Sequence, residues 1–112
     1  MPALLSSPQD ILVAEFYAKA REPGLSFDLG KAGRGEAVTL HHIEVAPRSR
    51  GTGIASRALE LLTRLADAHG VTLDLEVADE AGINTAAWYA RHGFSWAAEG
   101  GFMERHPAIY ES

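Results

Sequence analysis

The segment from residue 43 to residue 55 constrains the fold of this chain more than any other part. It contains a β-branched run that ends at Pro47, a short loop with two arginines and two glycines, and an amphipathic run that begins at Ile54. The first N–H groups of a helix have no partner within the helix, and the helix dipole places positive potential beside them. A strand, a glycine-rich loop and a helix in this order therefore predict a site for a phosphate or pyrophosphate.

The spacing within the loop excludes two familiar phosphate-binding motifs. A Walker loop continues with Lys and then Ser or Thr after its last glycine, but Gly53 is followed by Ile54 and Ala55. A dinucleotide-binding fingerprint needs a third glycine at the position that Ser56 occupies. Two interpretations of the segment remain: a different kind of phosphate loop, or an ordinary turn between a strand and a helix with solvated arginines.

The hydrophobic periodicity predicts an alternation of helices and strands. Ser7 and Asp10 bracket Pro8 in the manner of an N-terminal capping box. Alternating apolar residues from Val71 to Val77 predict a strand with one buried face and with Asp74 on the other face. The predicted elements are a helix that begins at Pro8 and stops near Glu22, strands at 25–29 and 37–46, a helix at 52–69, a strand at 71–77, a helix at 84–92, and a hairpin of strands at 94–98 and 102–105.

The order of these elements predicts an α/β fold of the α+β type with a mixed sheet. The helix at 52–69 separates the strands at 37–46 and 71–77, so a right-handed crossover between parallel strands is expected. The first two strands are expected to be antiparallel. A chain of 112 residues with 46% hydrophobic residues fits one packed domain that spans residues 1–112.

Charge and cysteine content exclude several classes of protein. The formal net charge is -5, which argues against a general affinity for nucleic acid or for an anionic membrane surface. The absence of cysteine excludes disulfides, Cys-ligated zinc and a cysteine nucleophile, and it is compatible with a reducing compartment. No apolar run reaches the length of a membrane span, and the N-terminus lacks a signal-peptide pattern. We therefore expect a cytoplasmic protein.

The loop resembles the acetyl-coenzyme A loop of the GNAT superfamily of N-acetyltransferases. The family's segment is a strand ending in Val-x-Pro, then a Gln or Arg followed by x-x-Gly-x and a Gly or Ala, and then a helix. This chain matches it with Val45-x-Pro47, with Arg48-x-x-Gly51-x-Gly53 and with the amphipathic run that follows.

A second segment carries the same resemblance. Tyr89-x-x-x-Gly93-Phe94 is similar to the end of a later helix in the GNAT family, and the similarity extends over about residues 25–105. It implies a GNAT-like mixed, mostly antiparallel sheet flanked by helices. Because a single helix precedes the first predicted strand, the family's first strand is expected to be missing.

The resemblance also implies acetyl-coenzyme A as the cofactor and a set of residues that bind it. The backbone of the strand before the loop would pair with the pantetheine arm, and the backbone of the loop would hold the pyrophosphate. A divergence between the strands that end at Val45 and Val77 would provide the slot. The implied binding residues are Ile43, Glu44, Val45, Arg48, Arg50, Gly51, Thr52, Gly53, Ile54, Ala55, Asn84 and Tyr89.

Two residues of the helix at 84–92 have alternative interpretations. Asn84 is either a cofactor contact or an N-cap, because Gly82 occupies the position that the family's asparagine takes relative to Tyr89. In the family this tyrosine reaches the cofactor sulfur, and a phenol with a pKa of about 10 is protonated at neutral pH, as a proton donor to a thiolate must be. The alternative for Tyr89 is a helix tyrosine that packs against the sheet.

Several side chains are candidates for the base that accepts the proton of an amine. Glu76 lies on the strand after the long helix, and His41, His42 and Glu44 lie on the strand before the loop. GNAT members take bases from both strands, and histidine has a suitable intrinsic pKa. Strict alternation puts His42 and Glu44 on one face and His41 with Ile43 on the other, unless a bulge changes the parity. Structural roles for the histidines, a solvated Glu76 and a water chain remain open.

A metal site is the competing interpretation of two of these residues. His42-x-Glu44 has a spacing that ligates zinc on a strand, and Glu76 is a third potential ligand. Nothing else in the chain completes the site, so no metal is expected.

These features predict an N-acetyltransferase that moves an acetyl group from acetyl-coenzyme A to a primary amine by direct attack. The acceptor would be a small-molecule or peptide amine, and the net acidity of the chain favours a cationic one. The alternative is a catalytically weak GNAT fold that binds coenzyme A or a protein partner. If a second copy covers an exposed sheet edge, a homodimer results.

Overall fold

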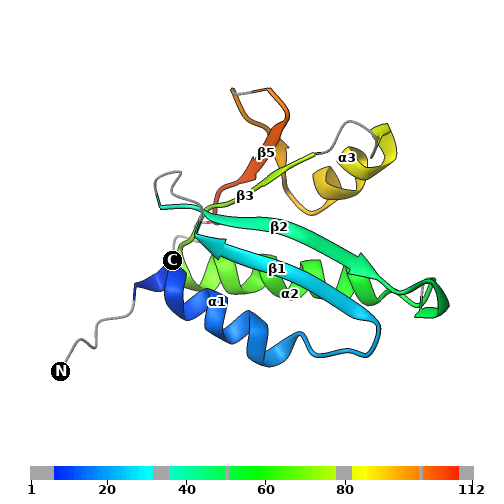
Figure 1. Ribbon diagram of the computed structural model, residues 1–112. Coiled ribbons are helices and arrows are strands. Elements are labelled where there is room, and N and C mark those ends of the chain that lie inside the picture. Colours follow the sequence, from blue (N-terminus) through cyan, green and yellow to red (C-terminus); the bar gives the residue numbers. More distant parts are fainter. Residues whose placement is uncertain (1–6, 32–35, 50, 78–81, 99, 109–112) are drawn as a thin grey trace.

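The computed structural model describes residues 7–31, 36–49, 51–77, 82–98 and 100–108, without the side chains of residues 82–84. Its helices and strands follow the predicted order (Figure 1). They are α1 (Pro8–Lys19), β1 (Leu25–Lys31), β2 (Val38–Val45), the short 3-10 helix η1 (Pro47–Ser49), α2 (Ile54–His69), β3 (Leu73–Glu76), α3 (Gly82–Arg91), β4 (Ser95–Trp96) and β5 (Phe102–Arg105).

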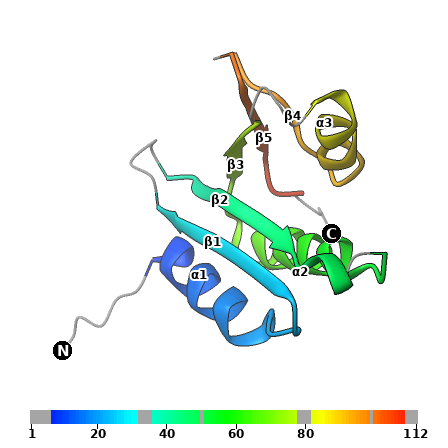
Figure 2. The ribbon, with the colours of Figure 1, turned by 45° about the vertical axis from the view of Figure 1, so that its right-hand side comes forward.

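The strands of the described residues form one mixed sheet in the order β1-β2-β3-β5-β4. β2 and β3 are parallel, with α2 between them in the chain, and the other neighbouring strands are antiparallel. α1 and α2 lie side by side along β1 and β2, whereas α3 lies at the other end of the sheet beside β3 and β5 (Figures 1 and 2). The predicted mixed, mostly antiparallel sheet with flanking helices is therefore confirmed.

A hydrophobic core joins α1, α2 and the inner face of the sheet. Apolar residues at helical spacing on α1 and α2 meet alternate residues of β2, β3 and β5. Full burial of a large apolar side chain contributes about 1.5–3 kcal/mol, so these residues hold the layers together. The largest fully buried side chains belong to Phe16, Leu12, Leu59, Leu62, Leu73, Leu75, Met103, Val38 and Val71.

The ends of three elements test the sequence prediction. The hydroxyl of Ser7 accepts a hydrogen bond from the backbone N–H of Asp10 at 3.1 Å, which confirms the N-terminal cap of α1. α3 begins at Gly82, so Asn84 lies in its first turn and the N-cap interpretation of Asn84 is wrong. β4 and β5 form the predicted hairpin, but β4 is only two residues long because its pairing stops at Trp96.

The prediction that β3 has one buried face is wrong at Asp74. This residue is only 4% exposed, and its carboxylate accepts a hydrogen bond from the hydroxyl of Thr39 at 2.5 Å. Thr39 and Asp74 are opposite each other in the parallel pairing of β2 and β3. Burial of a carboxylate is tolerated only with hydrogen-bond donors nearby, and the neighbouring strand supplies one. Alternation along a single strand does not contain that information.

A β-bulge at His41 divides β2 into two parts. Leu29 of β1 is opposite Leu40, whereas Asp28 is opposite His42, so His41 is an extra residue in β2. Leu40 therefore points inward before the bulge and Ile43 points inward after it, and both contact the core. His41 is exposed, so the strict alternation that grouped it with Ile43 is wrong, and the alternative with a bulge is correct.

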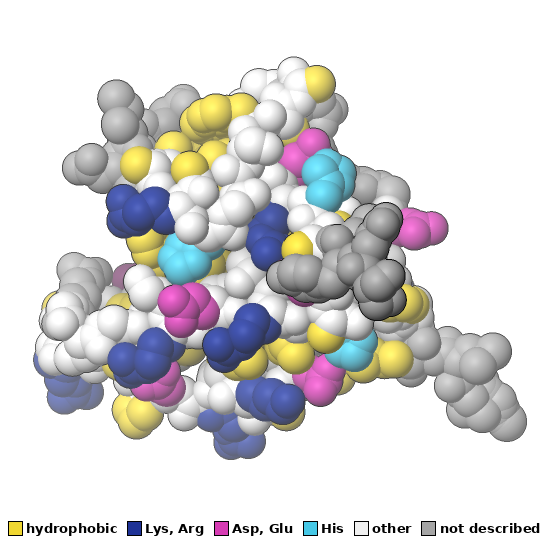
Figure 3. Space-filling model, turned by 180° about the vertical axis from the view of Figure 1, so that it is seen from behind, with side chains coloured by type: hydrophobic (Ala, Val, Ile, Leu, Met, Phe, Trp, Pro, Cys, Tyr) yellow, Lys and Arg dark blue, Asp and Glu magenta, His cyan; other side chains and the backbone are white. Residues whose placement is uncertain are grey.

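Charges of both signs cover the side of the molecule seen from behind (Figure 3). Lys and Arg side chains lie there among Asp and Glu side chains. The described ion pairs include Arg57 with Glu22 at 2.8 Å and Lys19 with Glu15 at 3.6 Å. Mixed signs weaken the long-range field of a surface. Among the helices of the described residues, none combines the length and the apolar character that a membrane span requires.

Candidate functional site

The loop between β2 and α2 turns on two glycines. Gly51 and Gly53 have φ angles of 83° and 82°. These angles lie in the left-handed region, which residues other than glycine rarely adopt. The hydroxyl of Thr52, between them, donates a hydrogen bond to the carbonyl of Ser49 at 2.6 Å. Gly53 is the N-cap of α2, and no described side chain caps it. The N-terminus of α2 therefore presents backbone N–H groups that a phosphate can accept from.

The turn between α1 and β1 braces this loop from outside. The guanidinium of Arg57 donates to the carbonyl of Thr52 at 2.9 Å and to the carboxylate of Glu22 at 2.8 Å. The carbonyl of Gly24 accepts a hydrogen bond from the backbone N–H of Ala46 at 2.7 Å. The loop is thus tied at two points to a segment more than twenty residues earlier in the chain, so its shape does not depend on its own glycines alone.

A pocket of about 340 Å³ opens at this loop. Its volume is at the lower end of the range of about 300–1,000 Å³ that small-molecule sites occupy. The end of β2, the loop, the first turn of α2 and one residue of α3 form its walls. The lining residues are Val45, Ser49, Gly51, Gly53, Ile54, Ala55, Ser56 and Trp88.

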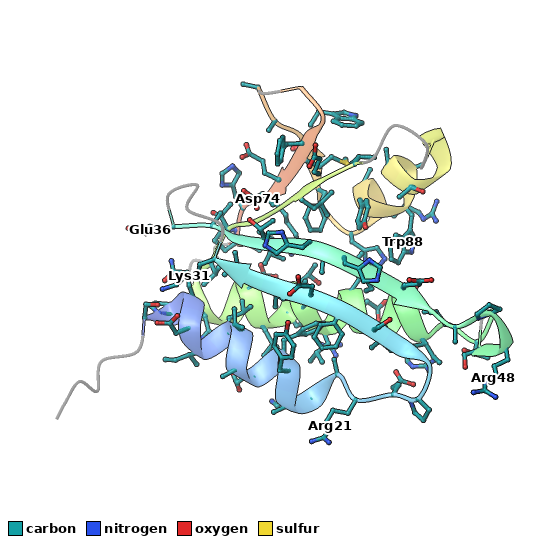
Figure 4. All side chains as sticks on the ribbon, in the orientation of Figure 1. Arg21, Lys31, Glu36, Arg48, Asp74 and Trp88 are labelled. Carbon is teal, nitrogen blue, oxygen red and sulfur yellow. The ribbon has the colours of Figure 1, made fainter. Side chains whose placement is uncertain are left out.

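The residues with an expected cofactor role divide into three groups. The pocket brings together five of them, which are Val45, Gly51, Gly53, Ile54 and Ala55. Five others are described but do not line it, which are Ile43, Glu44, Arg48, Thr52 and Tyr89. Arg48 is exposed at the outer end of the loop and points away from the body of the protein (Figure 4). Arg50 and the side chain of Asn84 lie outside the described part of the chain.

The expected divergence of β2 and β3 is present. Their parallel pairing covers three residue pairs and ends at Leu40 and Leu75. β2 continues through five more residues, from His41 to Val45, while β3 ends at Glu76. Over this second half, β2 therefore pairs with β1 alone among the described strands. Figure 1 shows β2 and β3 running apart beyond the last pair.

Tyr89 is half-buried on α3 and packs between aromatic rings. The centroid of its ring lies 5.7 Å from that of Phe94, edge to face, and 5.0 Å from that of Trp88. Burial raises the pKa of Tyr89 above its ordinary value of 10.0, so the phenol stays protonated at neutral pH. A role as proton donor and a packing role are both consistent with this placement, because Tyr89 also contacts the core.

The base candidates lie on β2 and β3. His41, His42 and Glu44 are exposed in the second half of β2, and Nε2 of His42 lies 3.3 Å from Oε1 of Glu44. Glu76 is exposed at the end of β3. None of these four residues is among the described residues that line the loop pocket. Within the described residues, no group of three or more His, Cys, Asp and Glu side chains is arranged to hold a metal ion.

Most of the sequence matches one protein family. Residues 13–94, more than half of the chain, match the model of the acetyltransferase (GNAT) family. The chain belongs to the GNAT family. No curated protein sequence shows significant similarity to it.

Solved structures share this GNAT fold. Nourseothricin acetyltransferase is 25% identical, with a TM-score of 0.57, and the match covers 76% of this chain and 58% of that one. The ribosomal-protein-S18-alanine N-acetyltransferase from Escherichia coli is 21% identical, with a TM-score of 0.58 and coverage of 87% and 78%. Ard1 from Thermoplasma volcanium is 12% identical, with a TM-score of 0.57 and coverage of 96% and 85%. The chain spans only between 50% and 58% of the length of the first three structures that it matches.

Two pocket residues of this GNAT domain are not among the expected cofactor-binding residues. Ser56 and Trp88 line the pocket, and the indole Nε1–H of Trp88 donates a hydrogen bond to the hydroxyl of Ser56 at 3.2 Å. The sequence identifies Ser56 only as the residue that breaks a dinucleotide-binding motif. Their contact joins positions 32 residues apart, and no local pattern encodes it.

Proposed function

We propose that this GNAT domain moves an acetyl group from acetyl-coenzyme A to a primary amine by direct attack of the amine on the thioester. The observation that carries the proposal is the loop after β2. Two left-handed glycines lead into a helix N-terminus without a side-chain cap among the described residues, and a pocket opens there. Such a loop accommodates a pyrophosphate, because backbone N–H groups approach the anion without interference from a Cβ.

The second half of β2 supports a role in holding the rest of the cofactor. The pairing of β2 with β3 ends at Leu40, so among the described residues no ladder with β3 extends along the second half of β2. An extended arm of amides binds to such an edge as an added strand would. Bound acetyl-coenzyme A would supply the thioester carbonyl that the amine attacks.

The residues of the chain then have distinct tasks in proton transfer. Tyr89 is the proposed acid, which donates its proton to the leaving sulfur as the carbon–sulfur bond breaks, and burial keeps it protonated. His41, His42, Glu44 and Glu76 are the candidates that accept the proton of the amine as the new carbon–nitrogen bond forms. The close approach of His42 to Glu44 favours this pair, because the carboxylate can orient the imidazole.

The experiment that tests the proposal is calorimetric titration of the protein with acetyl-coenzyme A. Binding should be lost in Gly53→Trp, because a Cβ at Gly53 would lie 3.2 Å from the guanidinium of Arg57, and the side chain would distort the loop that lines the pocket. Gly101→Trp is the matched control, since Gly101 has a similar φ of 85° and open space around it but does not line the pocket. Equal affinity of Gly53→Trp and wild type would contradict the assignment of the loop.

Turnover on a panel of primary amines separates catalysis from binding. Acetylation of an amine would support the transferase. A cationic amine is the expected acceptor, because the chain carries a formal net charge of -5. Binding of acetyl-coenzyme A without turnover on any amine would favour the alternative function, a catalytically weak module that binds coenzyme A or a protein partner.

A further inference from the structure

Among the described side chains of α3, the indole of Trp88 is the one that reaches the loop pocket. Every other lining residue comes from the end of β2, the loop or the first turn of α2. Figure 4 shows Trp88 between α3 and β2. Its Nε1–H donates to the hydroxyl of Ser56 at 3.2 Å, so the side chain bridges α3 and the helix that follows the loop.

The orientation of the indole is fixed on two sides. Its polar edge is held by Ser56, and its ring packs against Tyr89 at 5.0 Å and against the edge of His92 at 5.7 Å between centroids. Burial lowers the pKa of His92, so this neighbour is a neutral ring at pH 7. Trp88 nevertheless remains partly exposed, and it lines the pocket.

We infer that Trp88 binds coenzyme A directly, as an apolar wall against the pantetheine side of the cofactor. The inference rests on the proposed function, and it adds a cofactor contact that neither the motif of the loop nor the motif around Tyr89 contains. The pantetheine side is favoured because Trp88 shares the pocket with Val45, the last residue of β2, at the end of the strand proposed to pair with that arm. A rigid aromatic wall gives contact area at low entropic cost.

The chain allows a direct optical test because it has two tryptophans. Trp96 is 57% exposed on β4 and does not line the pocket, so Trp96→Phe leaves Trp88 as the sole indole without touching the site. Titration of Trp96→Phe with coenzyme A should change the emission of Trp88 saturably, with the same Kd as calorimetry gives. Adenosine bisphosphate, which lacks pantetheine, should change it much less at saturation. In Trp88→Phe, the emission of Trp96 should not respond.

Affinity measurements complete the test. Trp88→Phe should bind coenzyme A on the order of tenfold more weakly, because the smaller ring loses contact area. Ser56→Ala should weaken binding by about threefold, because the indole is no longer held, and Ser56→Thr should restore it through its hydroxyl. Thermal unfolding of each variant distinguishes lost contact from lost structure.

The outcomes separate this inference from the proposed function. Calorimetric binding of coenzyme A by Trp96→Phe with no change in emission would overturn the inference and leave the proposed function intact. An equal change with coenzyme A and with adenosine bisphosphate would overturn the assignment to the pantetheine side. No calorimetric binding by the wild type would overturn both.

Discussion

The two halves of β2 belong to one strand but have different surroundings. Val38, Thr39 and Leu40 are buried and pair with β1 on one side and β3 on the other. After the bulge at His41, the residues up to Val45 pair with β1 alone among the described strands, and their side chains are exposed or half-buried. The first half holds the sheet together, and the second half carries residues that are proposed to bind the cofactor. One strand therefore combines a structural part with a part whose proposed role is functional, and the bulge is the boundary between them.

The largest expected effect comes from a change in the buried half. Leu40→Ala should lower the free energy of unfolding by about 2–5 kcal/mol, because it removes a side chain that is only 3% exposed from the packed core. Ile43→Ala, in the second half, should cost only about 1 kcal/mol, because this side chain is already partly exposed. Chemical denaturation measures both. Equal losses would mean that the two halves do not differ in stability.

A substitution on α3 tests whether Tyr89 acts as the acid of the proposed reaction. Tyr89→Phe should reduce kcat about a hundredfold, the lower range for a lost acid, and should leave the affinity for acetyl-coenzyme A nearly unchanged. Because burial raises the pKa of Tyr89 above 10.0, deprotonation of this group should halve the activity of the wild type only at a pH above 10. Steady-state kinetics over a range of pH checks both statements. Unchanged turnover would leave Tyr89 with a packing role alone.

The buried hydrogen bond between β2 and β3 gives a smaller effect. Thr39→Val should destabilise the fold by about 1–3 kcal/mol, because the buried carboxylate of Asp74 loses the hydroxyl donor while the volume of the side chain is kept. Thr39→Ser, which retains the hydroxyl, is the matched control and should cost less than Thr39→Val. If the two variants are equally stable, the hydroxyl contributes nothing and the position needs only to be filled.

The smallest expected change in stability is at the exposed pair of the second half. His42→Ala should alter the free energy of unfolding by no more than about 0.5 kcal/mol, because contacts between exposed charged groups are worth little. Its effect on kcat/KM is the informative measurement. A loss of tenfold or more at unchanged stability would assign the base to this pair, and full activity would direct attention to His41 or Glu76.

The sequence predicted the elements of this fold because local signals were strong. The cap at Ser7, the apolar periodicity of α2 and the glycines of the loop each depend on residues a few positions apart, and the structure has a helix, a strand or a turn at each place. The family motif added the position of the loop and of α3.

The remaining features depend on neighbours that are distant in the chain. The alternation in β3 did not predict the hydrogen bond between Thr39 and Asp74. No spacing in the sequence predicted the hydrogen bond between Trp88 and Ser56. The brace from Glu22 to Arg57 likewise joins residues 35 positions apart. Such contacts depend on how the helices and the sheet pack on one another. A single sequence does not show which residues of one element lie opposite which residues of another. The roles of the individual site residues stay predictions until they are measured.

The bulge at His41 has a further consequence, because it acts on β2 as a frameshift acts on a reading frame. Upstream of it, even-numbered side chains point to the core, as Leu40 does, and downstream odd-numbered ones do, as Ile43 does. Removing His41 would restore regular alternation, since side chains have a period of two residues along a strand. Ile43 would still point to the core and Glu44 to solvent, because only His42 would then separate Leu40 from Ile43. In a regular strand that kept His41, Ile43 would instead turn to solvent and Glu44 toward the core. The bulge thus decides which face of β2 the predicted binding residues present.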